Sequence, residues 1–511
     1  MIRLIKYWIL KKEHLLFLFL FFIMQPLFSV GYEYNANCME AHNAIFRLQF
    51  NRAVGILTRE KQLNPGNHIP VLLENTIDFL KVFCNEDSKD LEKFKNSRDK
   101  RLEFLEKGDK NDPYYNWCRA EVYLQYAMSR VKFEEYITAV REIRKAYVLL
   151  EENKKKFPDF LPNIKSLGIL HTIIGSIPDQ YQWVTKLLSI GGSQQQGVDE
   201  MKKVIEISEK SPDLAFLHIE TVLMLSWISF TLDMGKKEMA SIDSYYKQTT
   251  VISAVHSSPL MAYTYAYFLI RYGRNDDALK VLFNSKDQLD TYPLYYTTYL
   301  TGIALLSRLD TASAKYFRYF NYKYQGRNYI KSSNYRLALI SLLKGRPDDY
   351  KTIMNTVLHV GNTTIEADKV AQFEAKSGLI PNVSLLKARL LFDGGYYQKS
   401  EEQLKLCNSR GILKNKRDSL EYNYRYARIY QMQDKTEPAI QIFQNSIAEG
   451  KGYPWYFAAN SALILATIYE EKHNFTLAKK YYHQCLDMDY EEFQSSISIK
   501  AKSGLRRIEK R

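Results

Sequence analysis

Three segments of equal length decide the fold, because they align without a gap at intervals of 36 residues. They read YTYAYFLIRYGRNDDA at 263–278, YLTGIALLSRLDTASA at 299–314 and YRLALISLLKGRPDDY at 335–350. Each segment begins with tyrosine, and a small residue follows three positions later, at Ala266, Gly302 or Ala338. Recurrence at a fixed interval of about 20 to 50 residues is the sequence signature of a repeat solenoid.

Each unit is predicted to be two amphipathic helices joined by a tight turn. A second position follows twelve residues after the first small residue, at Ala278, Ala314 and Tyr350. Gly273 and Gly345 lie between the two positions, where a turn needs a residue that tolerates a left-handed backbone. Small residues at facing positions let paired helices approach closely. The sequence therefore predicts an all-α fold, an α-α superhelix of paired antiparallel helices.

Further units lie on both sides of this block. Toward the C-terminus the paired positions recur every 39 residues, as Ala388 with Ser400, Ala427 with Ala439, and Ala466 with Ala478. Near the N-terminus, Ala41 and Ala53 are again twelve residues apart.

This pattern of small and aromatic residues on a helix–turn–helix resembles the tetratricopeptide repeat (TPR). The resemblance is specific over 259–489, moderate over 40–65 and weak elsewhere. It departs from the family in its longer period and in lacking the early tryptophan. The chain also resembles exported bacterial (Bacteroidota-like) TPR proteins of unassigned role, and that resemblance implies a fold but no function.

The first 31 residues are predicted to be a secretory signal peptide. Lys11 and Lys12 close a basic segment, an unbroken apolar run of ten residues follows at 15–24, and small residues precede a cleavage site near Gly31. The run is far shorter than the about 20 residues that a membrane-spanning helix needs. An uncleaved anchor is the alternative. We expect an exported protein, either periplasmic or associated with the outer membrane.

The mature chain divides into three predicted parts. Residues 32–156 form N-terminal TPR-like repeats, 157–235 form an irregular helical linker segment, and 236–511 form the C-terminal TPR solenoid. Within the linker, residues 157–197 are rich in proline and glycine, which predicts two short helices and a mobile loop at 191–197.

The last helix is predicted to cap the stack. Ile497, Ala501, Leu505 and Ile508 form one apolar stripe, and the basic residues between them are expected to point into solvent. Terminal repeats of a solenoid need such a wet outer face. The basic residues are Lys500, Lys502, Arg506, Arg507 and Lys510.

Charge and cysteine content give weaker bounds. The net charge is +14, and removal of residues 1–31 lowers it to +11. This charge fits either a preference for anionic partners or, more simply, basic residues spread over solvated helix faces. The cysteines show no Cys-x-x-Cys pair and an odd number, which favours small buried core residues over a disulfide framework, although one bridge is left open. They are Cys38, Cys84, Cys118, Cys407 and Cys485.

No motif argues for chemistry. The nine histidines show no His-Glu-x-x-His pattern, and neither a phosphate-binding loop nor Gly-x-Ser-x-Gly occurs. We therefore expect no enzyme, no cofactor and no metal. A catalytic site assembled near 161–183 is the low alternative. Export also makes nucleic acid an unexpected partner.

The tetratricopeptide resemblance implies a binding surface on the first helices of the repeats. We call the positions three before and one after the first small residue the inner-face positions, because they line the concave surface in that family. Tyrosine and arginine, which are common in binding hot spots, occupy most of them. The predicted partner-binding residues are Tyr263, Tyr267, Tyr299, Tyr335, Arg389, Tyr424 and Arg428. The alternative is that the tyrosines only pack between helices.

The leading hypothesis is a non-catalytic, exported scaffold or adaptor that holds a protein or peptide partner in this groove. The alternative is a binding protein for a small ligand, a glycan or lipid, which would use the tyrosine wall. Peripheral association with the envelope membrane is compatible with both. The two-carboxylate clamp of chaperone-binding relatives needs Lys and Asn where this chain has tyrosine, so that role is not implied.

Overall fold

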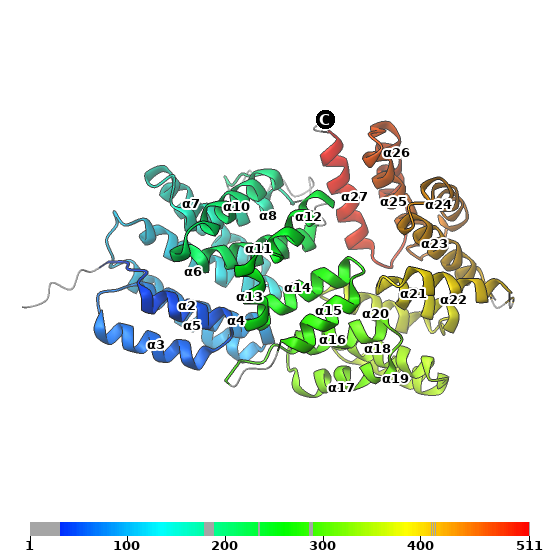
Figure 1. Cartoon of the computed structure of the whole chain (residues 1–511), viewed down its shortest axis with the longest axis horizontal. Coiled ribbons are helices and arrows are strands. Elements are labelled where there is room, and N and C mark those ends of the chain that lie inside the picture. Colours follow the sequence, from blue (N-terminus) through cyan, green and yellow to red (C-terminus); the bar gives the residue numbers. More distant parts are fainter. Residues whose placement is uncertain are drawn as a thin grey trace, which may run out of the picture.

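The chain folds as an all-α superhelix (Figure 1). The structure is a computed structural model that describes residues 31–177, 189–232, 236–285, 290–409, 411, 413 and 415–509. Within these ranges no β-strand forms, and one isolated bridge pairs Gly31 with Asn67. The predicted signal peptide lies outside the described residues, except for Gly31.

The helices follow one another from the N-terminus without long interruptions. The first block contains α2 (Ala36–Phe46), α3 (Phe50–Leu63), α4 (Ile69–Asn85), α5 (Ser88–Leu105), α6 (Pro113–Lys132), α7 (Tyr136–Lys156), α8 (Leu161–Ile174), α10 (Gln194–Glu209), η2 (Pro212–Leu214), α11 (Ala215–Leu232), α12 (Lys236–Tyr246) and α13 (Thr249–Ser257). The second block contains α14 (Pro259–Arg271), α15 (Asn275–Asn284), α16 (Tyr295–Ser307), η3 (Thr311–Ser313), α17 (Ala314–Lys323), α18 (Ile330–Leu343), α19 (Pro347–His359) and α20 (Glu366–Ser377). The last contains α21 (Val383–Asp393), α22 (Tyr397–Ser409), α23 (Lys416–Met432), α24 (Thr436–Gly450), α25 (Phe457–Glu471), α26 (Phe475–Leu486) and α27 (Gln494–Glu509).

The repeat phase predicted from the sequence is confirmed. Helices α14 and α15, α18 and α19, α21 and α22, α23 and α24, and α25 and α26 pack as consecutive pairs. Gly273 and Gly345 take positive φ values of 67° and 73° at their turns. The small residues have no exposed surface at Ala266, Ala278, Ala338, Ala388, Ser400, Ala427, Ala439, Ala466 and Ala478.

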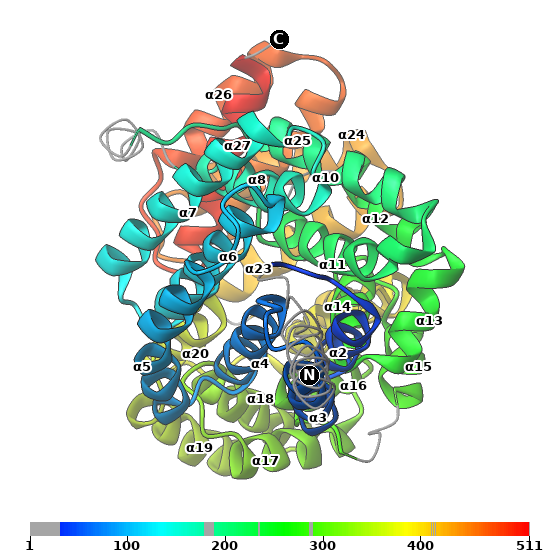
Figure 2. The same cartoon turned by 90° about the vertical axis from the view of Figure 1, so that its left-hand side faces the viewer.

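The N-terminal helices fold back against the middle of the superhelix. The hydroxyl of Ser258 donates to the Phe46 carbonyl, and the Tyr292 amide donates to the Leu48 carbonyl over 2.8 Å. Helix α2 contacts α11, and α4 contacts α16. Figure 2 shows α2 and α4 between α5–α7 on one side and α11–α15 on the other. One buried apolar cluster therefore runs from Tyr32 to Leu390, across both predicted boundaries within it.

Helix α11 is the most central element of the described chain. It contacts α2, α8, α10, α12, α13, α14 and α27. One stretch, Pro212–Phe230, is long and apolar enough to span a membrane by length and composition, and 61% of the tested window is buried inside the protein. Its His218 is 1% exposed and lies 3.0 Å from the Gln248 side chain. These contacts are those of a core helix, as the sequence predicted.

The predicted irregular segment contains more regular structure than expected. Helix α8 is fourteen residues long and packs against α10 as a pair. Helix α10 begins at Gln194, inside the expected loop, because the Ser193 hydroxyl accepts from the Gln196 amide over 3.1 Å and caps the helix. Gly168 and Gly197 lie where these helices touch, since a Cβ on Gly197 would lie 2.2 Å from the Gly168 carbonyl oxygen. The glycines here serve close helix packing.

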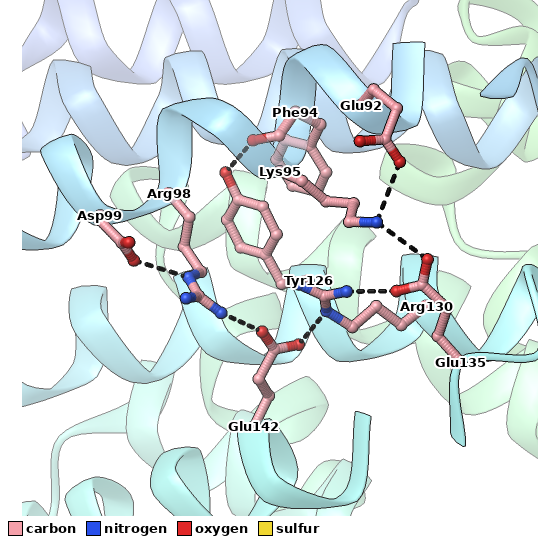
Figure 3. A network of polar contacts seen from close by, with 9 residues as sticks. All are labelled: Glu92, Phe94, Lys95, Arg98, Asp99, Tyr126, Arg130, Glu135 and Glu142. Carbon is pink, nitrogen blue, oxygen red and sulfur yellow. Dashed lines mark hydrogen bonds and ion pairs between the residues drawn. The ribbon is translucent and has the colours of Figure 1, made fainter. Parts of the chain in front are cut away.

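Side-chain ion pairs connect α5, α6 and α7 (Figure 3). Glu142 is 2% exposed and accepts from Arg98 over 2.6 Å and from Arg130 over 3.1 Å. The Tyr126 hydroxyl donates to the Phe94 carbonyl over 2.6 Å. Figure 3 shows these groups converging from three helices. A buried pair of this kind fixes the relative position of the helices more than it adds stability.

All five cysteines are buried free thiols, which confirms that they are core residues. Burial raises the pKa of Cys38, Cys84 and Cys485 to about 12. These thiols are therefore protonated and poorly reactive near neutral pH.

Candidate binding surface on the inner face

The seven predicted binding residues differ in accessibility. Tyr263, Tyr299, Tyr335 and Tyr424 are buried, with exposures of 6%, 7%, 2% and 2%. Tyr267, Arg389 and Arg428 are half-buried. The expectation of an accessible tyrosine ladder is therefore corrected for this conformation. The packing alternative describes the four rings better.

The physical reason is the contact between neighbouring repeats. The Tyr299 hydroxyl lies 2.7 Å from the Ser332 hydroxyl, and the Tyr424 hydroxyl accepts from the Asn460 amide over 2.5 Å. Ser332 and Asn460 each lie six residues before the first small residue of the following repeat. The repeat spacing thus places every such tyrosine against the next first helix, which covers it. Hydroxyl partners are what a buried tyrosine needs.

The apolar part of the inner face is covered by other helices. The Trp227 ring from α11 stacks on Tyr263 and Tyr267, with centroid distances of 5.8 and 6.3 Å. The Tyr263 ring also lies 6.2 Å from Tyr296. No surface for a small ligand is on view at these rings.

Glu86 joins the N-terminal block to the same region. It is 1% exposed and accepts from Lys132 over 2.8 Å, from the Asn328 amide over 3.1 Å and from the Tyr296 hydroxyl. Burial alone would raise its pKa, but Lys132 and these hydrogen bonds lower the pKa of Glu86 to about 2. The carboxylate is therefore ionised and fully used as a structural joint.

The polar part of the inner face is different, because charged groups from four elements meet there. Arg389 of α21 donates to the Tyr335 hydroxyl over 3.1 Å. Arg417 of α23 pairs with Glu374 of α20 over 2.7 Å. We call the residues Arg389, Arg417, Arg425, Glu374, Glu421 and Glu492 the arginine–glutamate cluster.

Arg425 extends the cluster toward the last repeat. It is 4% exposed, pairs with Glu421 over 3.2 Å and donates to the Tyr456 hydroxyl over 2.9 Å. Burial would raise the pKa of Glu421, but Arg425, Arg389 and Arg417 together lower it. The carboxylate of Glu421 is thus held ionised inside the protein.

A segment from the end of the chain lies against this cluster. Tyr490 and Glu492 are 4% and 2% exposed, although they belong to the connection between α26 and α27. The Phe493 ring packs edge-on against Tyr456 at 4.9 Å, and the Glu491 amide donates to the Pro454 carbonyl over 3.1 Å. We call residues 487–493 the C-terminal segment.

Glu492 is held in a state that favours its proton. Burial and the neighbouring Glu374 raise its pKa to about 8, against the opposing effect of Arg417 and Arg389. At neutral pH the Glu492 carboxyl is therefore mostly protonated. Sequence analysis missed this residue; the signal present was the run Tyr490-Glu491-Glu492-Phe493 directly ahead of the last helix.

The last helix anchors this segment and does not act as a solvated cap. Arg506 donates to the Gly175 and Ile177 carbonyls over 3.2 and 2.7 Å, which joins α27 to the end of α8. Arg507 pairs with Glu470 over 2.9 Å. The expectation that both arginines face solvent is wrong, because α27 packs inward between α8, α11 and the last repeat pair. Figure 1 shows its return toward α11 and α12.

A second buried charge group lies in the region proposed for a catalytic alternative. Lys165 of α8 is 1% exposed, pairs with Glu220 over 2.7 Å and lies 3.6 Å from Glu121. Burial lowers the pKa of Lys165, but Glu121 and Glu220 raise it further, so the amine stays protonated. A protonated, paired amine cannot act as a nucleophile.

Among the described residues, no group of three or more His, Cys, Asp or Glu side chains is arranged to hold a metal ion.

Comparisons with known proteins add little. No family model and no curated protein matches this sequence. Two solved structures of IFIT1 are similar to it, a monomeric mutant with Gppp-AAAA and another with m7Gppp-AAAA. Each has 14% sequence identity, and the alignment covers 74% of this chain and 95% of that chain with a TM-score of 0.29. A likeness at this TM-score carries no argument about function, so the helices themselves are the basis for the fold.

Proposed function

We propose that the chain is a non-catalytic, exported helical-repeat scaffold that binds a protein partner on its inner face. One observation carries the proposal. The arginine–glutamate cluster already holds an extended segment of protein, the C-terminal segment, with buried polar and aromatic side chains. A surface that accepts one segment of chain has the shape and chemistry to accept another.

The composition of this surface supports a protein partner. Arginine and tyrosine dominate binding hot spots, because they combine a large contact area with directional hydrogen bonds. Here Arg389, Tyr335, Arg425 and Tyr456 lie within hydrogen-bond distance in pairs. Arg428 extends the surface, since its guanidinium lies 5.0 Å above the Phe392 ring. No comparable observation favours a glycan or lipid.

The proposed location rests on the sequence of residues 1–31, a basic segment followed by a short apolar run and small residues. N-terminal sequencing of the purified native protein tests it. A start near residue 32 is expected. A cytosolic protein that still begins with Met1 would contradict export.

Site-specific photo-crosslinking in the native host tests the binding function. A photoreactive phenylalanine analogue replaces Arg428 on the inner face, and in a matched control it replaces Tyr322, which is 74% exposed on α17. We expect one recurrent protein crosslinked from position 428 and absent from position 322. Identical patterns at both positions, or no protein product at 428 in a folded variant, would remove the support for this function.

A further inference from the structure

The arginine–glutamate cluster contains buried polar atoms that the described residues do not satisfy. Glu374 Oε2 and Glu492 Oε2 accept no hydrogen bond, and Arg417 Nε donates none, within the part of the chain that the structure describes. Glu374 is 1% exposed, Glu492 2% and Arg417 9%. A buried donor or acceptor left unpaired is unfavourable by the full loss of its hydration. The site therefore has both an unused donor and an unused acceptor.

The charges around the site decide what kind of group fits there. Three arginines and two glutamates, Glu374 and Glu421, surround the position of Glu492. A third carboxylate would lie beside two others, which explains why burial and Glu374 raise the pKa of Glu492 to about 8. The group that enters is thus neutral at physiological pH, although the sequence supplies an acid.

A neutral carboxyl and a primary amide have nearly the same shape and the same hydrogen-bonding capacity at this site. Each offers a donor, which Glu374 needs, and an acceptor, which Arg417 needs. The amide of Gln or Asn keeps both at every pH, whereas a carboxylate only accepts. Glu492 is therefore a weaker version of the side chain that the cluster is built to hold.

The aromatic neighbour completes the site. Phe493 packs against Tyr456 at 4.9 Å, and Tyr456 packs against Tyr424 at 5.4 Å and accepts from Arg425. Phe493 also has a left-handed backbone, with φ of 60°, a conformation uncommon for a residue other than glycine. The C-terminal segment is thus held by good ring contacts at the expense of an unfavourable backbone conformation.

We propose that the cluster is the binding site for an extended segment of a partner protein that carries a glutamine or asparagine followed by an aromatic residue. The partner segment takes the place of Glu492 and Phe493, and the chain's own C-terminal segment is a competing occupant. This inference rests on the proposed function and specifies its partner chemistry. The pairs of Arg506 and Arg507 hold α27 from its other end while the segment is exchanged.

Peptide binding to the full-length chain tests the proposal. The probes are fluorescein-labelled peptides with the sequence of residues 487–498, either unchanged or with Glu492→Gln or Glu492→Leu. The receptor is the full-length Phe493→Ala variant, in which the competing segment is weakened. Phe283→Ala is the matched control, since that ring is 54% exposed on α15. Fluorescence anisotropy at pH 8.5 and pH 6 gives the affinities.

We expect the glutamine peptide to bind about tenfold or more tightly than the unchanged peptide at pH 8.5, since it gains hydrogen bonds to charged partners. The difference should shrink at pH 6, where the unchanged peptide is more readily protonated. The leucine peptide should bind at least about tenfold more weakly than the glutamine peptide. A full-length Glu492→Gln chain should bind all three weakly, because its own segment is then held more firmly.

Equal affinities for the three peptides, or no binding to any of them, would overturn the proposal. If Phe493→Ala does not fold, Glu491→Pro is the second receptor, because proline removes the amide donor to Pro454. A mass by light scattering twice that of the monomer in either receptor would show that a second copy occupies the site, which also overturns it. Failed peptides together with a partner captured at position 428 would leave the proposed function standing and remove this inference alone.

Discussion

Replacement of Glu492 by glutamine should change how the stability of the protein depends on pH. The pKa of Glu492 is about 8 in the folded protein, against a model value of 4.5. Between these values the folded state binds more protons than the unfolded state, so the free energy of unfolding falls as pH rises. Stability from this group is complete below about pH 4.5 and is lost progressively up to about pH 8.

The size of the effect follows from the same two values. Each pKa unit corresponds to about 1.4 kcal/mol, so holding Glu492 protonated at pH 7 lowers stability by about 3 kcal/mol relative to pH 4.5. Glutamine does not titrate and keeps the same donor and acceptor. Glu492→Gln should therefore be more stable than wild type by about 3 kcal/mol at pH 7 and by about 5 kcal/mol above pH 8, and nearly equal to it at pH 4.5.

Urea denaturation at pH 5, 7 and 8.5 measures this difference, provided that the slope of the transition stays the same for both proteins. Glu402→Gln is the matched control, since Glu402 is exposed on α22 and should give the same small difference at each pH. A Glu492→Gln effect that is constant across the three pH values would refute the reasoning. It would show that Glu492 ionises in the folded protein as it does in water.

Three further substitutions test the packing and the buried charges, each by its denaturation midpoint. Ala439→Leu should lower stability by about 1 to 3 kcal/mol, because Ala439 has no exposed surface between paired helices; an unchanged midpoint would mean that the repeat phase is misassigned. Tyr299→Phe should lower stability by about 1 kcal/mol through loss of the contact with Ser332, and no loss would argue against a sealed ring. Lys165→Met should lower it by about 3 to 5 kcal/mol, because Glu121 and Glu220 stay buried without their cation; a neutral effect would mean that water reaches them.

Local pattern was enough to predict most of the architecture. The interval between Ala266 and Ala338 and the glycines at 273 and 345 depend only on packing within one helix pair, which the sequence encodes directly. The structure confirms each of these positions as buried or as a left-handed turn. The same logic predicted the core role of α11 and of the cysteines.

Contacts between distant parts of the chain could not be predicted in this way. The pattern places Tyr299 correctly on its helix, but the covering contact with Ser332 depends on how one repeat is stacked on the next. The hydrogen bonds of Arg506 to Gly175 and Ile177 join residues about 330 positions apart. An amphipathic stripe such as that of α27 shows that one face is buried and leaves open whether the charged face meets solvent or another helix.

Glu492 shows the same limit at the candidate site. A glutamate in a connection between helices is ordinarily exposed, and only the return of α27 buries it among three arginines. The arginines at 389 and 428 were found because they occupy repeat positions. Arg417, Arg425 and Glu374 lie outside those positions and gain their meaning from the segment that meets them.

Hydrogen exchange of the peptide spanning residues 487–493 in the free, full-length protein tests most directly whether the inner face is occupied by the chain itself. The exposed turn at 378–380 is the internal reference for a connection that packs against nothing. The buried side chains of Tyr490 and Glu492 and the bond from the Glu491 amide to Pro454 predict exchange much slower than at that turn. Exchange as fast as at residues 378–380 would contradict the account, because the cluster would then be open to solvent.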